Sequence, residues 1–122
     1  MFEVKVLSEF AAAHYLRGYK GKCENMHGHN YKLEVIVSAK KLNSLGLAID
    51  FVDIKKELSI VTEQLDHKLL DELSFFKKSN PSAENIAKHI YTRLKLTLNK
   101  NGVKLKSVLV WETDRSCATY SE

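Results

Sequence analysis

Apolar and polar residues alternate along two stretches in the first third of the chain, and a period of two is typical of a β-strand with one buried face. The first alternation begins at Phe2 and continues towards Phe10, and the second begins at His29 and ends near Val37. Residues 17–23, which include two glycines, are expected to form the loop between them. We therefore predict two long strands that pair antiparallel.

Apolar residues then recur every three or four positions, which is typical of an α-helix. A predicted turn at residues 43–46 precedes the first repeat, with Asp50 as the N-cap and Asp53 as the carboxylate that completes a capping box. We expect this helix to end near Asp66 and His67. Its predicted buried positions are Ile54, Leu58, Val61 and Leu65.

A second helix is predicted to start at Asn80, a favourable cap, followed by Pro81, which suits the first helical position. Asn101 and Gly102 are expected to end it. Its predicted buried positions are Ile86, Ile90, Leu94 and Leu98.

Two further stretches, Val103–Glu112 and Cys117–Tyr120, are predicted to form a closing pair of strands that turns at Asp114 and Arg115. The order strand, strand, helix, helix, strand, strand indicates an α+β fold, a four-stranded antiparallel sheet with both helices packed on one face. We expect residues 1–122 to form a single domain. The outer strands of such a sheet are unpaired, which favours edge-to-edge assembly into an oligomer.

Composition narrows the class of protein. The chain has 122 residues, two cysteines and a net charge of +4. No secretory leader begins at Met1 and no apolar run reaches the length of a membrane span, so we expect a cytoplasmic protein without a membrane partner, in which Cys23 and Cys117 stay reduced. The lysines are scattered without an arginine and aromatic pattern, so nucleic acid is not an expected partner.

The candidate chemistry gathers in Cys23–His29, which reads Cys-Glu-Asn-Met-His-Gly-His. On an extended strand, His27 and His29 point to the same face, so both rings can bind one metal ion. His14 is the nearest third ligand, and three neutral imidazoles with one open position are a familiar catalytic zinc set. Histidines also take structural or exposed positions, so spacing alone leaves both interpretations open.

Further landmarks follow along the chain. In order they are Phe10–Leu16 with His14, the cysteine and histidine motif, Asp50-Phe51, Leu65–Lys68, Asn80–Asn85 and Trp111–Thr113. Together they resemble the 6-pyruvoyl-tetrahydropterin synthase and 6-carboxy-tetrahydropterin synthase family. The resemblance implies a tunnelling fold (T-fold), a homohexamer built as a dimer of trimers with active sites at subunit interfaces, zinc on the three histidines, and 7,8-dihydroneopterin triphosphate as the small-molecule substrate.

The resemblance also implies catalytic roles. Cys23 becomes the general base that removes a proton from the substrate side chain, in place of the buried apolar role that is common for a free cysteine. His67 becomes a proton relay and Asp66 the carboxylate that orients its ring, acting with the cysteine across a subunit boundary. From the residues alone, Asp66 and His67 are equally well explained as a polar helix end.

Glu112 has an ordinary interpretation as a charge at a strand end. By resemblance it is the pterin anchor and part of the charge relay, because a carboxylate accepts two hydrogen bonds from the amino and ring N–H groups of a pterin. Ser82 and Glu84 stand where the family has pterin-pocket residues, whereas Ala83 replaces a hydroxyl that some members carry. Three nearby cations either meet the triphosphate or form a solvated loop: Arg17, Lys20 and Lys22.

Spacing within the motif favours one branch of the family. Three residues separate Cys23 from His27, which resembles the 6-carboxy-tetrahydropterin synthases of queuosine and other deazapurine pathways, enzymes that release acetaldehyde and triphosphate. Glu24, three residues before His27, resembles instead a subgroup that forms 6-hydroxymethyl-dihydropterin for folate synthesis. We predict a zinc-dependent carbon-carbon lyase of the carboxy-tetrahydropterin type. The alternatives are a lyase that uses Glu24 as base, a 6-pyruvoyl-tetrahydropterin synthase, and a non-catalytic pterin-binding protein.

Overall fold

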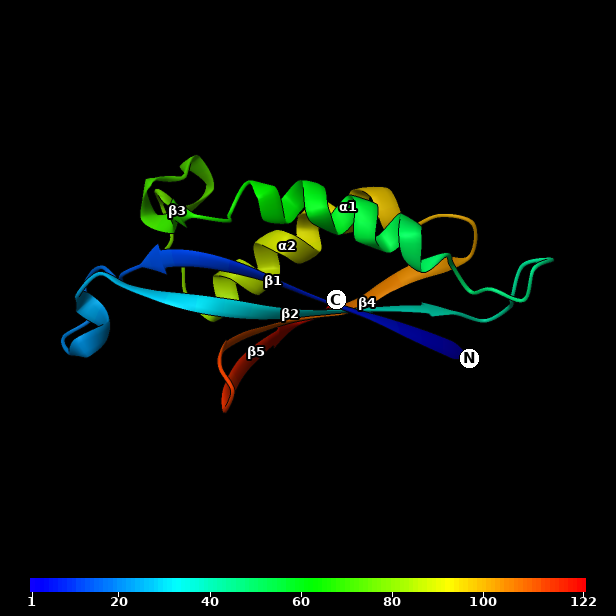
Figure 1. Cartoon of the computed structure of the whole chain (residues 1–122), viewed down its shortest axis with the longest axis horizontal. Coiled ribbons are helices and arrows are strands. Elements are labelled where there is room, and N and C mark those ends of the chain that lie inside the picture. Colours follow the sequence, from blue (N-terminus) through cyan, green and yellow to red (C-terminus); the bar gives the residue numbers. More distant parts are fainter.

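The computed structural model describes residues 1–122 as one mixed sheet with both α-helices on one of its faces (Figure 1). The strands lie in the order β3-β1-β2-β4-β5. They are β1 (Phe2–His14), β2 (His27–Ala39), β3 (Lys68–Leu69), β4 (Val103–Thr113) and β5 (Ser116–Tyr120). The helices are α1 (Phe51–Glu63) and α2 (Ala83–Leu98), with short 3-10 turns at Lys22–Glu24, Leu70–Glu72 and Ser74–Phe76. The predicted α+β class, with the helices on one face, is confirmed.

Strands β1 and β2 form the long antiparallel pair that the alternation predicts. Their register runs from Phe2 opposite Ala39 to His14 opposite His27. β1 continues past Phe10 to His14. The alternation fades after Phe10 because the alanines that follow are small enough to fit either face of a sheet. The extension matters for function, since it carries His14 to the position directly across from His27.

The sheet has five strands and is mixed, so the predicted four-stranded antiparallel sheet is wrong in strand number and in direction. The extra strand, β3, pairs parallel with β1 through Ala12 opposite Lys68 and Ala13 opposite Leu69. Two residues are too few to produce a periodic hydrophobic pattern, so the sequence carries no signal for this strand. β2 with β4 and β4 with β5 are antiparallel.

Helix α1 begins where the sequence predicts but ends earlier. The Asp50 carboxylate accepts a hydrogen bond of 2.9 Å from a backbone N–H of the first turn, whereas the side chain of Asp53 makes none, so the predicted capping box does not form. The helix ends at Glu63 and not near Asp66 and His67. His67 has a φ of 57°, which lies in the left-handed region and cannot continue a right-handed helix.

Helix α2 begins two residues later than predicted. Ser82 is the N-cap, and its Oγ accepts a hydrogen bond of 3.2 Å from the backbone N–H of Asn85. Asn80 and Pro81 therefore precede the helix. The amide of Asn80 is engaged by Arg17 and is not available to cap the helix.

The remaining turns follow the sequence. Residues 43–46 turn between β2 and α1, residues 114–115 turn between β4 and β5, and Asn101 and Gly102 turn the chain after α2 with φ values of 55° and 79°. Left-handed backbone of this kind is accessible to glycine and asparagine at little cost, which is why this pair turns the chain towards β4. The helix itself ends earlier than predicted, at Leu98 with Asn99 as its C-cap.

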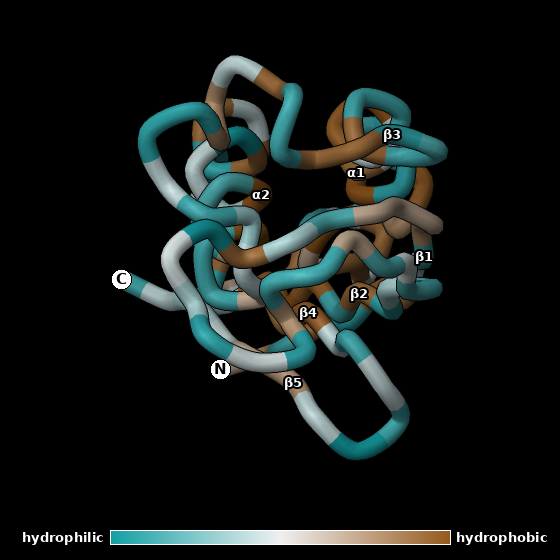
Figure 2. The backbone as a smooth tube through the Cα atoms, turned by 90° about the vertical axis from the view of Figure 1, so that its left-hand side faces the viewer, coloured by the Kyte–Doolittle hydropathy of each residue, from teal (hydrophilic) through white to brown (hydrophobic).

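The core lies between the sheet and the two helices. All eight helix-region positions predicted to be buried are at most 4 % exposed. Figure 2 shows hydrophobic segments of the helices and strands gathered in the interior and hydrophilic segments along outer loops. None of the helices has the length and apolar character needed to cross a membrane.

Candidate active site

Three histidines meet at one end of the β1–β2 pair. His14 closes β1 on its buried face, and His27 and His29 lie on β2, where residue alternation places both on one face. One ligand nitrogen from each ring lies within 4.8 Å of the others. The ring centroids are 4.6 to 5.1 Å apart. The structure therefore brings together the three residues that the sequence proposed as metal ligands.

Backbone carbonyls determine which nitrogen is free in two of these rings. His14 Nδ1 lies 2.7 Å from the carbonyl oxygen of Pro81, and His27 Nδ1 lies 2.7 Å from that of Asn25. A carbonyl can only accept, so in the neutral rings both Nδ1 atoms carry the hydrogen and both Nε2 atoms carry a lone pair. These Nε2 atoms are 3.0 Å apart. Two lone pairs at that separation repel each other unless a cation binds both.

His29 completes the donor set. Burial lowers the pKa of its ring, and the neighbouring His14 and His27 lower it further, against the opposing effect of Glu112. The ring is thus held in the neutral form that binds metals, and its Nε2 is buried without a hydrogen-bond partner. Three neutral imidazoles with unpaired nitrogens fit a metal ion that takes nitrogen ligands.

The proposed bases lie on the loop that joins the two histidine-bearing strands. Cys23 and Glu24 share the 3-10 turn Lys22–Glu24, and the backbone N–H of Leu16 donates to the Cys23 carbonyl at 2.8 Å, which ties this turn to the residues that follow β1. Cys23 is half-buried and Glu24 is exposed. The side chain of Glu24 takes part in no hydrogen bond or ion pair within the chain.

Glu112 lies beside the histidines, near the end of β4. Its Oε1 is 3.7 Å from His14 Nε2, and the side chain is 31 % exposed. Glu112 and Glu84 line one hollow between the start of α2 and β5. Ser82 directly precedes Ala83, the first residue that lines this hollow. Its Oγ accepts the hydrogen bond that caps α2. The structure thus places two predicted pocket carboxylates at one hollow beside the histidines.

Asp66 and His67 form a carboxylate and imidazole pair, with 3.0 Å between Asp66 Oδ2 and His67 Nδ1. The backbone N–H of Ala11 donates to Asp66 at 2.9 Å and is the main reason that the pKa of this carboxyl lies below its ordinary value. The side chain of His67 is 82 % exposed. Its left-handed backbone is uncommon outside glycine and often marks functional positions.

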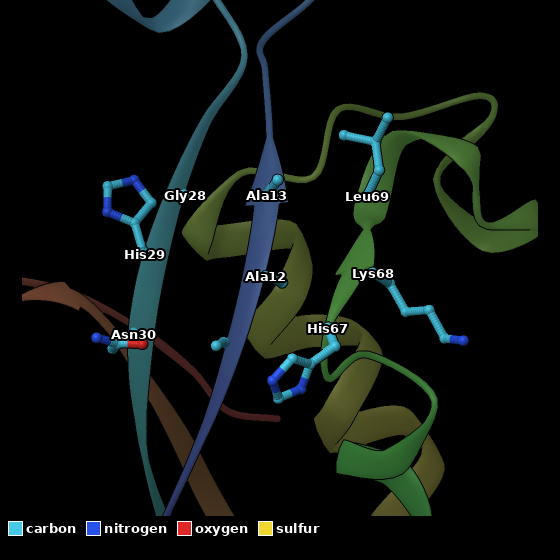
Figure 3. A pocket seen from close by; sticks show the side chains of 9 residues that line it. Ala12, Ala13, Gly28, His29, Asn30, His67, Lys68 and Leu69 are labelled. Carbon is cyan, nitrogen blue, oxygen red and sulfur yellow. The ribbon is translucent and has the colours of Figure 1, made fainter.

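This pair lies apart from the histidine cluster within the chain. A shallow hollow crosses β1, with His67 on one side of that strand and His29 on the other (Figure 3). No hydrogen bond or ion pair joins Asp66 or His67 to Cys23 or to the three histidines. A role for the pair at the histidines of its own chain is therefore not supported by direct contact.

Sequence reasoning missed a network behind the cluster. The Arg17 guanidinium donates to the carbonyls of Lys77 and Ser79 at 3.0 and 2.8 Å and lies 3.7 Å from the buried carboxylate of Asp71. Asp71 also accepts from the backbone N–H of Tyr15 at 3.0 Å. Arg17 is thus a structural link between the segment after β1 and residues 71–80, and not a freely solvated loop residue. Asp71 stands next to Glu72 after two leucines, and nothing in that local pattern distinguishes the buried carboxylate from an exposed one.

Three imidazoles with free nitrogens, beside a hollow lined by carboxylates, form a site for a small molecule next to a potential metal centre. The chain belongs to the 6-pyruvoyl tetrahydropterin synthase family, whose pattern matches residues 3–122. The resemblance drawn from the sequence landmarks is confirmed. The chain is accordingly a pterin-processing, lyase-type enzyme by family.

The chain matches proteins named as 6-carboxy-tetrahydropterin synthases and as 6-pyruvoyl tetrahydropterin synthases at similar sequence identity. The chain is 31 % identical to the 6-carboxy-5,6,7,8-tetrahydropterin synthase of Haemophilus influenzae, over 100 % of both chains. It is 34 % identical to a putative 6-carboxy-5,6,7,8-tetrahydropterin synthase of Archaeoglobus fulgidus, over 91 % of this chain and 88 % of the relative. The structure of Caenorhabditis elegans 6-pyruvoyl tetrahydropterin synthase superposes with a TM-score of 0.89 at 30 % identity, covering 99 % of this chain and 95 % of that one.

Proposed function

We propose that the protein is a zinc-dependent 6-carboxy-5,6,7,8-tetrahydropterin synthase. It converts 7,8-dihydroneopterin triphosphate to 6-carboxytetrahydropterin, acetaldehyde and triphosphate, in the cytoplasm and for queuosine or related deazapurine synthesis. The observation that carries the proposal is Cys23, which is half-buried in the turn between the two histidine-bearing strands and separated from His27 by three residues. The names of the Haemophilus influenzae and Archaeoglobus fulgidus relatives support the same reaction.

His14, His27 and His29 hold the zinc ion in this proposal. Two nitrogens bound to one tetrahedral zinc lie about 3.3 Å apart, close to the 3.0 Å between the Nε2 atoms of His14 and His27. When bound, zinc supplies Lewis-acid polarisation of substrate oxygens. The carbonyls of Pro81 and Asn25 orient two of the ligand rings, as outer partners of metal-binding histidines commonly do.

The other side chains bind substrate and move protons. Glu112 accepts hydrogen bonds from the pterin amino and ring N–H groups, which places the pterin in the hollow that Glu84 also lines. Ser82 adds a hydroxyl at the edge of this pocket. The substrate side chain then extends towards the histidines, where the Cys23 thiolate removes a proton from a side-chain carbon.

Asp66 and His67 act at the site of a neighbouring subunit. Their separation from the histidines by β1, the high exposure of His67 and the hydrogen bond from Ala11 that orients Asp66 all support a relay that faces outwards from its own chain. The assembly that meets this requirement in the proposal is a homohexamer, a dimer of trimers, with active sites at subunit interfaces.

A second candidate activity rests on Glu24. Its carboxylate is exposed, takes part in no ion pair and adjoins Cys23 in the same turn. A carboxylate at this position is free to serve as the base of a lyase that forms 6-hydroxymethyl-dihydropterin. Cys23 and Glu24 then act as alternative bases on the side chain of one substrate.

The test is a product analysis by mass spectrometry after anaerobic incubation of zinc-loaded protein with 7,8-dihydroneopterin triphosphate. We expect 6-carboxytetrahydropterin and acetaldehyde from the wild type. Cys23→Ala should retain zinc and lose the carboxypterin, whereas Glu24→Gln should lose only any hydroxymethyl-dihydropterin. Full carboxypterin activity in Cys23→Ala removes Cys23 from the mechanism. Tight pterin binding by the zinc-loaded wild type without turnover indicates a non-catalytic binding protein.

A further inference from the structure

The ring of His14 is oriented by a distant part of the chain. Its Nδ1 donates to the carbonyl of Pro81 at 2.7 Å, across 67 positions of sequence. Pro81 is buried and directly precedes the N-cap of α2. The direction of this single carbonyl decides which nitrogen of His14 carries the hydrogen, so whatever holds the carbonyl also sets the metal-binding form of the ring.

Asn80 fixes the segment on the side before Pro81. Its Oδ1 accepts from the backbone N–H of Arg17 at 3.0 Å and from Arg17 Nε at 3.2 Å, and its Nδ2 donates to the Arg17 carbonyl at 3.0 Å. The amide thus satisfies both backbone polar groups of Arg17, as a paired strand would. Because Arg17 follows His14 by three residues and Asn80 precedes Pro81 by one, these bonds and the His14 bond join the same two segments.

Helix α2 fixes the segment on the other side. Asn85 Nδ2 donates to the carbonyl of Asn80 at 2.9 Å, and Ser82 accepts from the backbone N–H groups of Asn85 and Ile86. The pyrrolidine ring of Pro81 restricts its own φ and keeps the preceding residue extended. The carbonyl of Pro81 is therefore held between two anchored neighbours.

We propose that Asn80 is a positioning residue for the metal ligand His14, and that it acts by clamping Arg17 so that the Pro81 carbonyl stays on His14 Nδ1. The inference rests on the metal site proposed above. Without the clamp, the segment stays attached to Arg17 only through its guanidinium, which donates to backbone carbonyls before Asn80. The backbone of Arg17 no longer holds the residue next to Pro81, and the Pro81 carbonyl no longer enforces hydrogen on Nδ1. The ring then populates the form with hydrogen on Nε2, which cannot bind metal through that atom. Asn80 touches neither metal nor substrate in this role.

The first test measures zinc affinity of the full chain by competition with a chromophoric chelator. Loss of an outer-shell partner of a metal-binding histidine typically lowers metal affinity about 10–100-fold, and we expect Asn80→Ala to fall at the lower end of that range. Asn80→Asp keeps the acceptor for Arg17 and loses the donor to the Arg17 carbonyl, so a smaller loss is expected. Wild-type affinity in a folded Asn80→Ala variant overturns the proposal.

Asn43→Ala is the matched control. Asn43 also uses its side-chain oxygen to hold a turn, accepting from the backbone N–H groups of Leu45 and Leu47 at 2.9 and 3.0 Å, but it lies beyond the opposite end of β2. We expect its zinc affinity to equal that of the wild type. An equal loss in Asn43→Ala and Asn80→Ala points to general destabilisation and overturns the clamp.

The second test does not require metal. Nitrogen-15 correlation spectra of the imidazoles in metal-free protein report which nitrogen of His14 is protonated. We expect Nδ1 protonation in the wild type and Asn43→Ala, and a mixture of both forms in Asn80→Ala. An unchanged His14 spectrum in Asn80→Ala overturns the proposal. If Asn80→Ala does not fold, the same spectrum of Asn80→Asp provides the test, and an unchanged His14 signal there overturns the proposal. If wild type binds no zinc, the proposed function fails, whereas this spectrum still tests the clamp.

Discussion

At the scale of single residues, hydrogen-bond partners decide what each histidine can do. His14 and His27 present Nε2 because carbonyls occupy Nδ1, and His67 is oriented by Asp66. His89 shows a different outcome for the same side chain. It stacks on Phe75 with ring centroids 3.9 Å apart, and its Nε2 is buried without a partner. These surroundings suit an uncharged ring in a structural position.

This environment predicts a pH dependence of stability. Burial, reinforced by Arg93, lowers the pKa of His89 to about 4 from an ordinary value of 6.5. Between these pH values the unfolded chain binds a proton that the folded chain does not, so stability falls as the pH falls through this window, by at most about 1.4 kcal/mol per pH unit. The variant His89→Phe should lose this component. Urea unfolding of both proteins from pH 7 to pH 4 measures it, and identical pH profiles would contradict the prediction.

At the scale of elements, strand register and helix starts position the site. The β1–β2 register sets His14 opposite His27, and a slip of one residue would turn His27 and His29 to the other face of the sheet. Helix starts matter equally, because Ser82 begins α2 beside the hollow that Glu84 lines. The site therefore depends on where elements begin and end as much as on which residues they contain.

The cap of α1 provides a test at this scale. Asp50 accepts a backbone hydrogen bond, whereas Asp53 in the same first turn makes no side-chain bond. Asp50→Ala should cost about 1 kcal/mol of stability and lower the Tm by about 4 °C. Asp53→Ala is the matched control and should cost less, because only its interaction with the helix dipole is lost. Thermal unfolding of the two metal-free variants and the wild type measures these losses. Equal losses of stability in Asp50→Ala and Asp53→Ala would indicate that Asp53 completes a capping box after all.

At the scale of the whole molecule, β1 separates two sets of proposed catalytic groups. Cys23 and the histidines lie at the end of the β1–β2 pair, and Asp66 and His67 lie beside β1 at the edge where β3 pairs. Glu112 reaches the histidines from β4. In the homohexamer proposed above, the two sets come together between subunits, with each site taking one set from each of two chains.

This arrangement predicts complementation between inactive variants. Cys23→Ala and His67→Ala should each have little activity, because each lacks one group at every site. Random mixing of the two chains, by co-expression or by refolding together, should restore about a quarter of the wild-type activity, since that fraction of interfaces receives both intact groups. Activity assays on the mixed and separate proteins measure the effect. A mixture that stays inactive would place both groups in one chain's site or remove His67 from the reaction.

The sequence by itself determined the class of fold, the helix faces and the identity of the candidate chemistry. Alternation and helical periodicity report burial, and burial is decided residue by residue along the chain, so Leu58 and Ile90 could be assigned to the core directly. The His-Gly-His spacing likewise places two rings on one face of any strand. The family resemblance then supplied roles that no periodicity could supply.

Tertiary structure alone decided what depends on contacts between distant segments. The two-residue strand β3 forms because β1 offers an edge with which it can pair. Asn80 lies outside helix α2 because its side-chain amide is hydrogen-bonded to Arg17. The Pro81 carbonyl that selects the free nitrogen of His14 is brought there by the same packing. Such pairings join residues more than fifty positions apart, and a local pattern cannot encode a partner that the chain meets only after it has folded.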